Sequence, residues 1–472
     1  MPVISGNTSI RYSAYFIASL LFTLLCSDNS FFWDSVRQVS IPAGFYFDND
    51  FSALFMSSGE ETGHQPFMGM YIALIWKFFG KSLLVSHLAM LPFVFGILIQ
   101  LDKLVLRGRP GKTDFILIIL ITVCDATLLS QMSMITFDIP HIFFFLWCVN
   151  SILGGNRKIL AFAFTFLMLI SLRGTLSGIG ILLFVITRIL ISDNRVTLKN
   201  MLPFFPGLVS FFIFVALFLH SNGWVVFNPG SPDYNTFGSL AAPGEIFRNI
   251  GLTGWRLIDF GRAGIWMIFL FIIIKSIRRK TLFDAFYSDL FLVAVCQFAV
   301  FFFIVILFRN PFGHRYFLPV IIPVSIAVTY WVLKYSRLKY RLYTLMLVIV
   351  LSGYFWIYPA GIASGWDATP AHWPYFKVQK EMNENIVAAG IDYSKIGSFF
   401  PVKGSTRFID LEEPGVNIHE ADLVSDDYIL YSNVCNVGDT YLDELFDGTK
   451  WQRLIEVRHK RVFMILFKRK HA

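Results

Sequence analysis

The chain of 472 residues is 55% hydrophobic and 17% aromatic, but only 15% charged. Soluble domains average about 25% charged residues, so this composition excludes an ordinary soluble enzyme. Apolar runs of about 17–23 residues recur along the chain and predict an all-α polytopic membrane protein. The net charge of +8 does not predict a nucleic-acid partner, because most basic residues lie in short loops, where they set orientation.

We expect about eleven transmembrane helices, the first a retained span rather than a cleaved signal. With the N-terminus on the cytoplasmic side, the inner segments hold 18 Lys and Arg residues and the outer loops hold 9, which agrees with the positive-inside rule. The C-terminal region then lies outside the cytoplasm. The expected spans cover residues 12–28, 83–105, 114–131, 138–153, 158–172, 175–191, 201–221, 263–275, 288–308, 316–333 and 342–359.

Residues 67–79 form an apolar segment that we do not expect to cross the membrane. Thirteen residues make a helix of roughly 20 Å, against a hydrocarbon core of about 30 Å. Counting the segment as a span would also move basic loops to the outer side. We therefore predict that an outer loop, residues 29–82, carries helices lying along the interface, one of them started by Pro66.

The tail is the polar part of the chain. We expect a transmembrane module over residues 1–360 and a small extracytoplasmic α/β domain over residues 361–472. The tail pattern predicts a helix near 377–389, strands in IGSFF and YILYSNV, a short helix in YLDELF and a closing hairpin through WQRLIEVR and RVFMILFKR. A middle outer loop is expected at 221–262.

Asp34 is the strongest candidate for a general base. It follows Phe31-Phe32-Trp33 just beyond the first span, so an aromatic wall would partly desolvate its carboxylate and increase its proton affinity. The structural alternative is an N-cap for a helix over residues 35–40.

The opening loop holds further acids and a histidine. Asp48 and Asp50 form a D-x-D triplet that is a weak candidate for a divalent metal, although a turn is the favoured interpretation. Glu60, Glu61 and His64 precede the apolar segment and would line a site, or simply keep the loop soluble. The sequence does not point firmly to any cofactor, and a divalent metal is not expected.

Arg173 and Arg315 interrupt apolar sequence at two outer boundaries. Two arginines that converge from different spans can hold a phosphate through charge-assisted, bidentate hydrogen bonds. Anchoring to lipid headgroups is the alternative for each. Asp138 and Asp125 lie near the outer half of their spans, where buried charges need partners.

Four segments, in order over about residues 10–335, resemble lipid-linked-sugar glycosyltransferases with the GT-C fold, and most closely the protein O-mannosyltransferases and the lipid A aminoarabinose transferases. The segments are HQPFMGMYIALIWKFFGKS, TFDIPHIFFFLW, LISLRGTLSGIGILLF and HRYFLPVIIP. Arg173 stands where that family usually has Lys. Gln65 stands where it often has Pro, and Ser35 follows Asp34 where the family often has a second acid.

The resemblance implies an inner-membrane enzyme whose donor is a sugar on a polyprenyl monophosphate and whose acceptor is a glycan, lipid or protein of the cell envelope. Asp34 matches the family's base, and Arg173 and Arg315 would neutralise the departing phosphate. Glu60, Glu61, His64, Asp138 and Tyr316 would line the donor and acceptor sites. A single displacement of this kind inverts the anomeric carbon.

Two other classes of function remain open from the sequence. A surface-polysaccharide polymerase or ligase would use a diphosphate-linked donor and would carry its dominant outer loop late in the chain. A lipid-linked sugar transporter would show repeated halves with broken helices and charges near the midplane. A scramblase-like binder with a soluble sensing domain is a further non-enzymatic reading.

Overall fold

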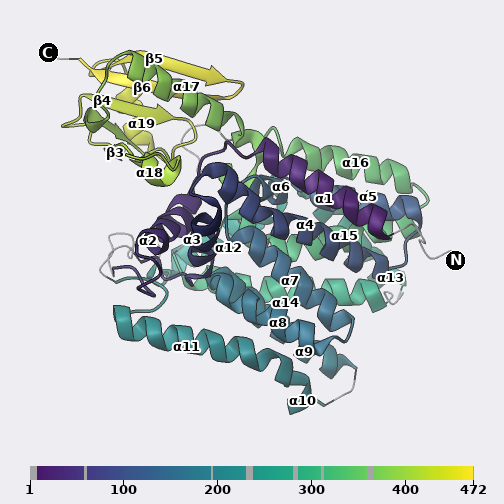
Figure 1. Cartoon of the computed structure of the whole chain (residues 1–472). Helices are drawn as coiled ribbons and strands as arrows, with labels where there is room; N and C mark the ends of the chain where they lie inside the picture. The colour runs from purple at the N-terminus through teal and green to yellow at the C-terminus, as the bar shows by residue number, and fades with distance from the viewer. Residues whose placement is uncertain are drawn as a thin grey trace.

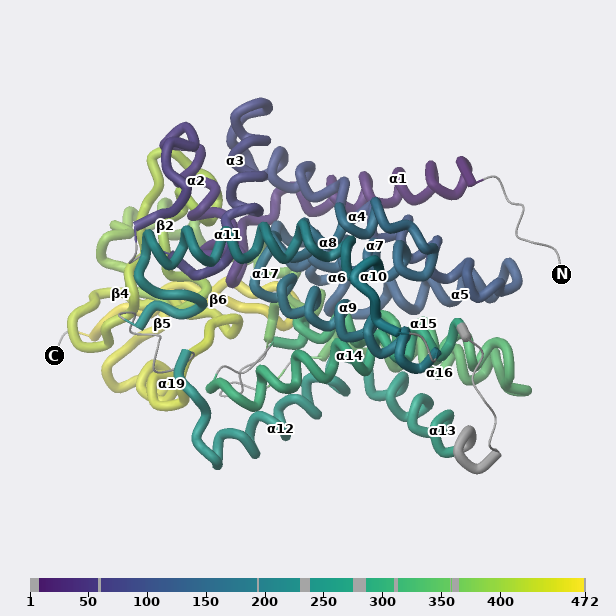
Figure 2. Tube along the Cα trace, turned by 90° about the horizontal axis from the view of Figure 1, so that it is seen from below, coloured from purple at the N-terminus to yellow at the C-terminus, as the bar shows by residue number. Residues whose placement is uncertain are grey.

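The computed structural model describes residues 8–57, 61–192, 195–229, 238–279, 285–309, 313–356, 358 and 365–470. A body of long helices carries a β-sheet domain at one end (Figure 1). The start of α1 lies at the opposite end of the body, and Figure 2, a view turned by 90°, shows the same arrangement. The expected domain boundary at 360/361 falls outside the described residues.

Each of the eleven expected spans coincides with helical structure, but fewer helices are long enough to cross a bilayer. Among the residues that the structure describes, six helices qualify by length and composition, or up to eight if each of two bent pairs counts as one span. α7, α8 and α16 have only 16, 14 and 14 residues. The helices of the body are α1 (Thr8–Leu25), α4 (Leu83–Arg107), α5 (Lys112–Val123), α6 (Ala126–Met132), α7 (Asp138–Leu153), α8 (Arg157–Ile170), α9 (Leu172–Ile191), α10 (Leu198–Met201), η2 (Leu202–Phe204), α11 (Phe205–Asn222), α13 (Ala263–Arg279), α14 (Ala285–Leu307), α15 (Leu318–Tyr335) and α16 (Lys339–Ser352).

α15 forms the centre of the helical body. Its sequence is apolar on every side, which is typical of a helix surrounded by others. Within residues 314–335, 94% of the most apolar stretch of 18 residues is buried. It packs against α5, α13, α14 and α16. The start of α15 is therefore a rigid place from which to project a polar side chain.

The opening loop folds into η1 (Val36–Ser40), a π-helix, followed by α2 (Ile41–Asp48) and α3 (Phe67–Phe79). The helix expected at 67–79 is present, with Pro66 as its N-cap residue rather than its first residue. α2 and α3 approach closely, because a Cβ on Gly69 would lie 2.7 Å from the Cβ of Pro42. The position of α3 along a membrane interface stays a prediction.

The middle loop contains a helix that the sequence pattern did not predict. α12 (Pro243–Ile258) is bent by 98° from α13. Asn249 fixes it to α14, because its Nδ2 donates to the carbonyls of Val305 at 2.9 Å and Phe308 at 2.8 Å.

The C-terminal domain is a six-stranded mixed sheet of order β2-β3-β1-β4-β6-β5. The strands are β1 (Ile396–Ser398), β2 (Gly404–Ser405), β3 (Asn417–Glu420), β4 (Tyr428–Ser432), β5 (Trp451–His459) and β6 (Val462–Arg469). The helices are η5 (Trp366–Ala368), η6 (Pro370–His372), α17 (Pro374–Ala388), η7 (Tyr393–Lys395), α18 (Thr406–Ile409) and α19 (Asp439–Phe446). The predicted α/β character, both strands, both helices and the closing hairpin are confirmed, while β2, β3 and α18 are additional.

This domain docks on the opening loop. The backbone N–H of Phe31 donates to the carbonyl of Ile409 at 2.9 Å, and the hydroxyl of Ser40 donates to the carbonyl of Phe408 at 2.6 Å. The Phe32 ring stacks on His372 at 4.9 Å between centroids. The loop thus forms one unit with the domain, although more than 300 residues separate them in the chain.

Candidate functional site

The residue before Asp34, Trp33, has an unusual backbone conformation that orients the Asp34 side chain. Trp33 has a φ of 59°, a conformation that costs a bulky residue about 1–3 kcal/mol and that clusters at functional sites. The Trp33 ring packs edge-on against Phe400 of the C-terminal domain, with centroids 5.0 Å apart. Asp34 is not the N-cap of the helix that follows. Ser35 is the N-cap residue of η1, and no side-chain capping bond is seen there.

Arg173 lies in the first turn of α9, directly after a sharp break between two helices. Ser171 adopts an extended backbone, and its hydroxyl caps α9 by accepting from the N–H of Gly174 at 3.2 Å. A Cβ on Gly174 would lie 2.2 Å from the carbonyl oxygen of Leu167, so this tight break requires glycine. It places a guanidinium inside the protein, where the Arg173 side chain is only 4% exposed.

Arg315 and Tyr316 come from η4 (His314–Phe317), the short 3-10 helix that leads into α15. The Tyr316 hydroxyl accepts from Nη2 of Arg173 at 2.7 Å. The guanidinium carbon of Arg173 also lies 3.8 Å from the centroid of the Tyr316 ring, a cation–π contact. The two arginines that the sequence singled out therefore converge.

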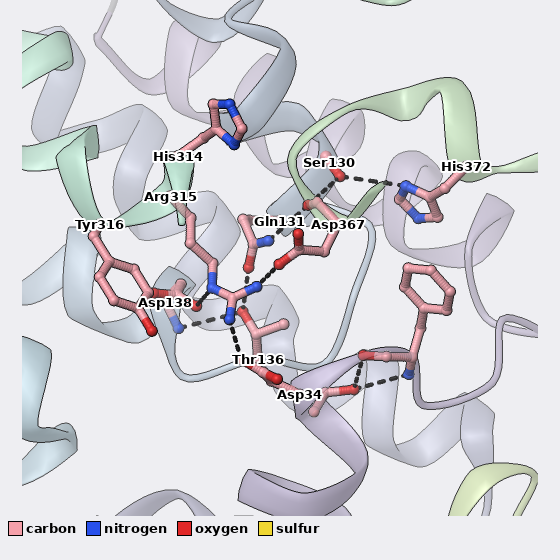
Figure 3. Close-up of polar contacts among 12 residues, drawn as sticks. Asp34, Ser130, Gln131, Thr136, Asp138, His314, Arg315, Tyr316, Asp367 and His372 are labelled. Carbon is pink, nitrogen blue, oxygen red and sulfur yellow. Dashed lines mark hydrogen bonds and ion pairs between the residues drawn. The ribbon is translucent and has the colours of Figure 1, made fainter. Parts of the chain in front are cut away.

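Three carboxylates surround these two guanidinium groups, and Figure 3 shows the three around Arg315. Asp138 accepts from Nη1 of Arg173 with both oxygens, at 2.8 and 2.6 Å, and lies 3.3 Å from Nε of Arg315. Asp34 accepts from Nη2 of Arg315 and lies 3.7 Å from Arg173. Asp367 pairs with Nη1 of Arg315. With the acids ionised, the five side chains carry a net charge of −1.

Asp367 is the member of this cluster that sequence reasoning missed. It lies in η5, and its backbone carbonyl accepts from the Ser130 hydroxyl at 2.7 Å and from Nε2 of Gln131 at 2.8 Å. The start of the C-terminal domain is thereby tied to α6. One signal was available: Asp367 follows Trp366 after the last apolar run, just as Asp34 follows Trp33 after the first.

A small pocket lies beside the cluster. Asp34, Asp138, Arg315 and Asp367 line it, together with apolar and neutral polar side chains from the opening loop, from α6 and from the turn after α6: Phe32, Trp33, Ser35, Gln38, Val39, Gln131, Met134, Thr136 and Phe137. The side chains of Asp138 and Asp367 are 4% and 8% exposed, whereas that of Asp34 is 34% exposed. Asp34 is therefore the carboxylate of this cluster that an incoming molecule can reach most easily.

His64 lies beside the cluster, with its ring 5.0 Å from that of Phe137 between centroids. Burial, followed by the positive charge of Arg173, lowers the pKa of His64 to about 3, so the imidazole is neutral at physiological pH. Its Nδ1 is buried and has no hydrogen-bond partner among the described residues. A neutral imidazole here suits contact with an uncharged group better than with a phosphate.

The hydrogen bonds of Gln65 give a reason for a glutamine at the position where the family often has proline. Its Nε2 donates to the carbonyl of Met168 at 3.2 Å and to the Thr175 hydroxyl at 3.0 Å. Those two acceptors lie on either side of the break that carries Arg173. The glutamine thus fastens the opening loop to the α8–α9 break, which a proline cannot do because its ring has no hydrogen-bond donor.

The remaining acids of the opening loop that the structure describes do not join the cluster. Glu61 is buried, and its Oε1 accepts from the N–H of Met56 at 2.6 Å, so it holds the loop itself. Glu60 lies outside the described residues.

Asp48 and Asp50 have separate partners. Asp48 pairs with Arg407 at 3.0 Å and Asp50 pairs with Lys77. Within the described ranges, no three His, Cys, Asp or Glu side chains come together as a metal site would require.

Comparison with known proteins gives a structural likeness only. No family model and no curated protein matches the chain. Two crystal structures are similar over 98% of this chain and 98% of theirs, both of ArnT from Cupriavidus metallidurans, a lipid A aminoarabinose transferase. The one bound to undecaprenyl phosphate is 12% identical and the apo one 11%, each with a TM-score of 0.48.

Proposed function

We propose that the protein is an inverting membrane glycosyltransferase that moves a hexosyl or pentosyl group from a polyprenyl-phosphate donor to a hydroxyl of a cell-envelope acceptor. The observation that carries this proposal is the convergence of Asp34, Arg173 and Arg315 beside one pocket. An accessible carboxylate and two buried guanidinium groups are the two kinds of group that such a transfer needs.

Asp34 serves as the general base. Its carboxylate is 34% exposed at the pocket, where an acceptor hydroxyl can approach within hydrogen-bonding distance. The hydroxyl proton passes to Asp34 while the acceptor oxygen forms a bond to the anomeric carbon. The bond between that carbon and the phosphate oxygen breaks, and its electron pair leaves with the phosphate. A single displacement from the opposite face inverts the configuration.

Arg173 and Arg315 stabilise the departing phosphate. Charge-assisted hydrogen bonds from guanidinium to phosphate are strong and often bidentate, and they gain strength where water is excluded. The Arg173 and Arg315 side chains are only 4% and 7% exposed. Because phosphate is already a good leaving group, the reaction requires no acid catalyst. A glycoside hydrolase would need a second catalytic carboxyl group, whereas Asp138 is committed to Arg173 through both oxygens.

The arrangement of the chain suits a reaction at a membrane surface. The residues that line the pocket come from the opening loop, from α6 and the turn after it, and from η4 and η5, so the pocket lies where the helical body meets the C-terminal domain. The start of α1 lies at the far end of the body (Figure 2). With a cytoplasmic N-terminus, as the charge distribution favours, the pocket and the domain over residues 361–472 face the outside of the inner membrane. The bilayer and the apolar helices then accommodate the prenyl chain, and the domain covers the acceptor side.

The experiment that tests this function compares donor binding by arginine variants. Arg315→Ala in the full-length, detergent-purified protein should raise the KM for a polyprenyl-phosphate sugar by tenfold or more, since a charged hydrogen bond is worth about 1.5–3 kcal/mol. Arg309→Ala is the matched control, because Arg309 pairs with Glu245 at 3.0 Å away from the pocket. Release of polyprenyl phosphate is measured over a panel of sugars. An unchanged KM in the Arg315 variant would contradict the clamp.

A further inference from the structure

Both terminal nitrogens of Arg315 are already paired with carboxylates, so no two of its donors are free to bind a phosphate together. Its Nη1 pairs with Asp367, its Nη2 with Asp34, and its Nε lies 3.3 Å from Asp138. The five charged groups of the cluster already sum to −1. A phosphate would add one or two negative charges in a largely buried place, where like charges repel strongly. Donor phosphate can therefore reach Arg315 only if one carboxylate withdraws.

The three carboxylates are not held equally. Asp138 is gripped by Arg173 through both oxygens, at 2.8 and 2.6 Å. Asp34 is shared between both arginines, with Arg173 at 3.7 Å. The carboxylate of Asp367 has Arg315 as its described ion-pair partner. Asp367 is therefore the carboxylate that leaves at the smallest cost.

The backbone around Asp367 allows its side chain to move without unfolding the segment. The carbonyl of Asp367 stays fixed by Ser130 and Gln131 at 2.7 and 2.8 Å. A rotation about the side-chain bonds of Asp367 would leave both of these backbone contacts in place.

We propose that Asp367 is a displaceable anion, which occupies on Arg315 the position that the donor phosphate takes and which leaves when the donor binds. This inference rests on the proposed function and assigns a role to the C-terminal domain, which supplies a competitor for the donor's own binding group. The affinity for the donor is then the intrinsic affinity multiplied by the fraction of molecules in which Arg315 is free.

The test is a binding measurement on the full-length protein in nanodiscs, with a polyprenyl monophosphate as the probe and the uncharged polyprenol as the reference. Asp367→Asn should lower the Kd for the monophosphate by about tenfold, which corresponds to a parental free fraction of about one tenth, and should leave polyprenol binding unchanged. Asp367→Glu, which keeps the charge, should bind like the parent. Asp367→Ser provides a second neutral variant if the asparagine variant does not fold.

The outcomes separate this inference from the function on which it rests. If the parent binds the monophosphate better than polyprenol and the folded neutral variants bind it equally or more weakly, Asp367 is a structural ion-pair partner and the inference is overturned. If the parent binds the monophosphate no better than polyprenol, and Arg315→Ala changes nothing, the proposed donor class itself fails.

Discussion

Replacing Asp138 by asparagine perturbs the most deeply buried ion pair of the site. The Asp138 and Arg173 side chains are each 4% exposed and are joined by contacts of 2.8 and 2.6 Å. Removing one partner of a buried pair costs about 3–5 kcal/mol, because the other charge is left uncompensated. Arg173 would keep the Tyr316 hydroxyl at 2.7 Å and Asp34 at 3.7 Å. We therefore expect a loss near the lower limit, about 3 kcal/mol.

The assay combines stability with donor binding. Asp138→Asn should lower the apparent melting temperature in detergent by several degrees and should also raise the donor KM, since Arg173 is no longer held against its carboxylate. Asp102→Asn is the matched control: Asp102 is a fully buried acid that pairs with Arg11 at 3.0 Å, but it does not line the pocket. The control should lose stability and keep its donor KM.

A specific result would refute this reasoning. If Asp138→Asn melts at the parental temperature and binds donor normally, the ion pair neither stabilises the fold nor orients Arg173. If both variants raise the donor KM equally, the effect is a general loss of stability rather than a loss of orientation at the site.

Two further predictions concern groups that connect the opening loop to its surroundings. Gln65→Ala removes two hydrogen bonds to the α8–α9 break, so it should lower the free energy of unfolding by about 2 kcal/mol and raise the donor KM. A parental melting temperature and KM would show that the break positions Arg173 without help from Gln65. Burial raises the pKa of Asp410, which accepts from Ser30 across the domain interface, to about 6 from its ordinary value near 4. Asp410 therefore stabilises the interface most below about pH 4, and this contribution is lost as the pH rises through 6. Asp410→Asn should raise the free energy of unfolding at pH 8 by at most about 3 kcal/mol, seen as a higher melting temperature, and should leave it unchanged near pH 4. Equal shifts at both pH values would contradict the assignment.

The sequence located much of the charged cluster because membrane proteins restrict where charge can lie. Asp34, Arg173 and Arg315 stand at the ends of apolar runs, and the count of basic loops assigned those ends to one side of the membrane. Their meeting in one charged cluster agrees with that assignment. The break that carries Arg173 was also visible, since two apolar runs flank it without a polar loop.

Other features depend on contacts that no local pattern reveals. Asp367 joins the cluster only because the tail folds back onto α6 and the opening loop. Asp48 and Asp50 looked like a pair in the chain, yet their partners, Arg407 and Lys77, draw them to different places. α12 was missed because Gly244, Gly251 and Gly254 weaken its helix propensity, and packing on α14 supplies the missing stability.

The number of spans was also beyond local reasoning. Hydropathy located each apolar segment, but α7, α8 and α16 end after 14–16 residues. α8, for example, ends at Ser171, whose extended backbone and side-chain cap already begin α9.

The central claim is that Asp34 accepts the proton of the acceptor hydroxyl, and one measurement tests it most directly. Purified Asp34→Asn is compared with the parent for transfer from a polyprenyl-phosphate sugar, with Asp50→Asn, an exposed acid of the same loop, as the control. Loss of a general base costs about 10²–10⁴-fold in rate, so the account predicts a kcat lower by at least a hundredfold in the Asp34 variant and a parental kcat in the control. A folded Asp34→Asn protein with parental kcat would contradict the account.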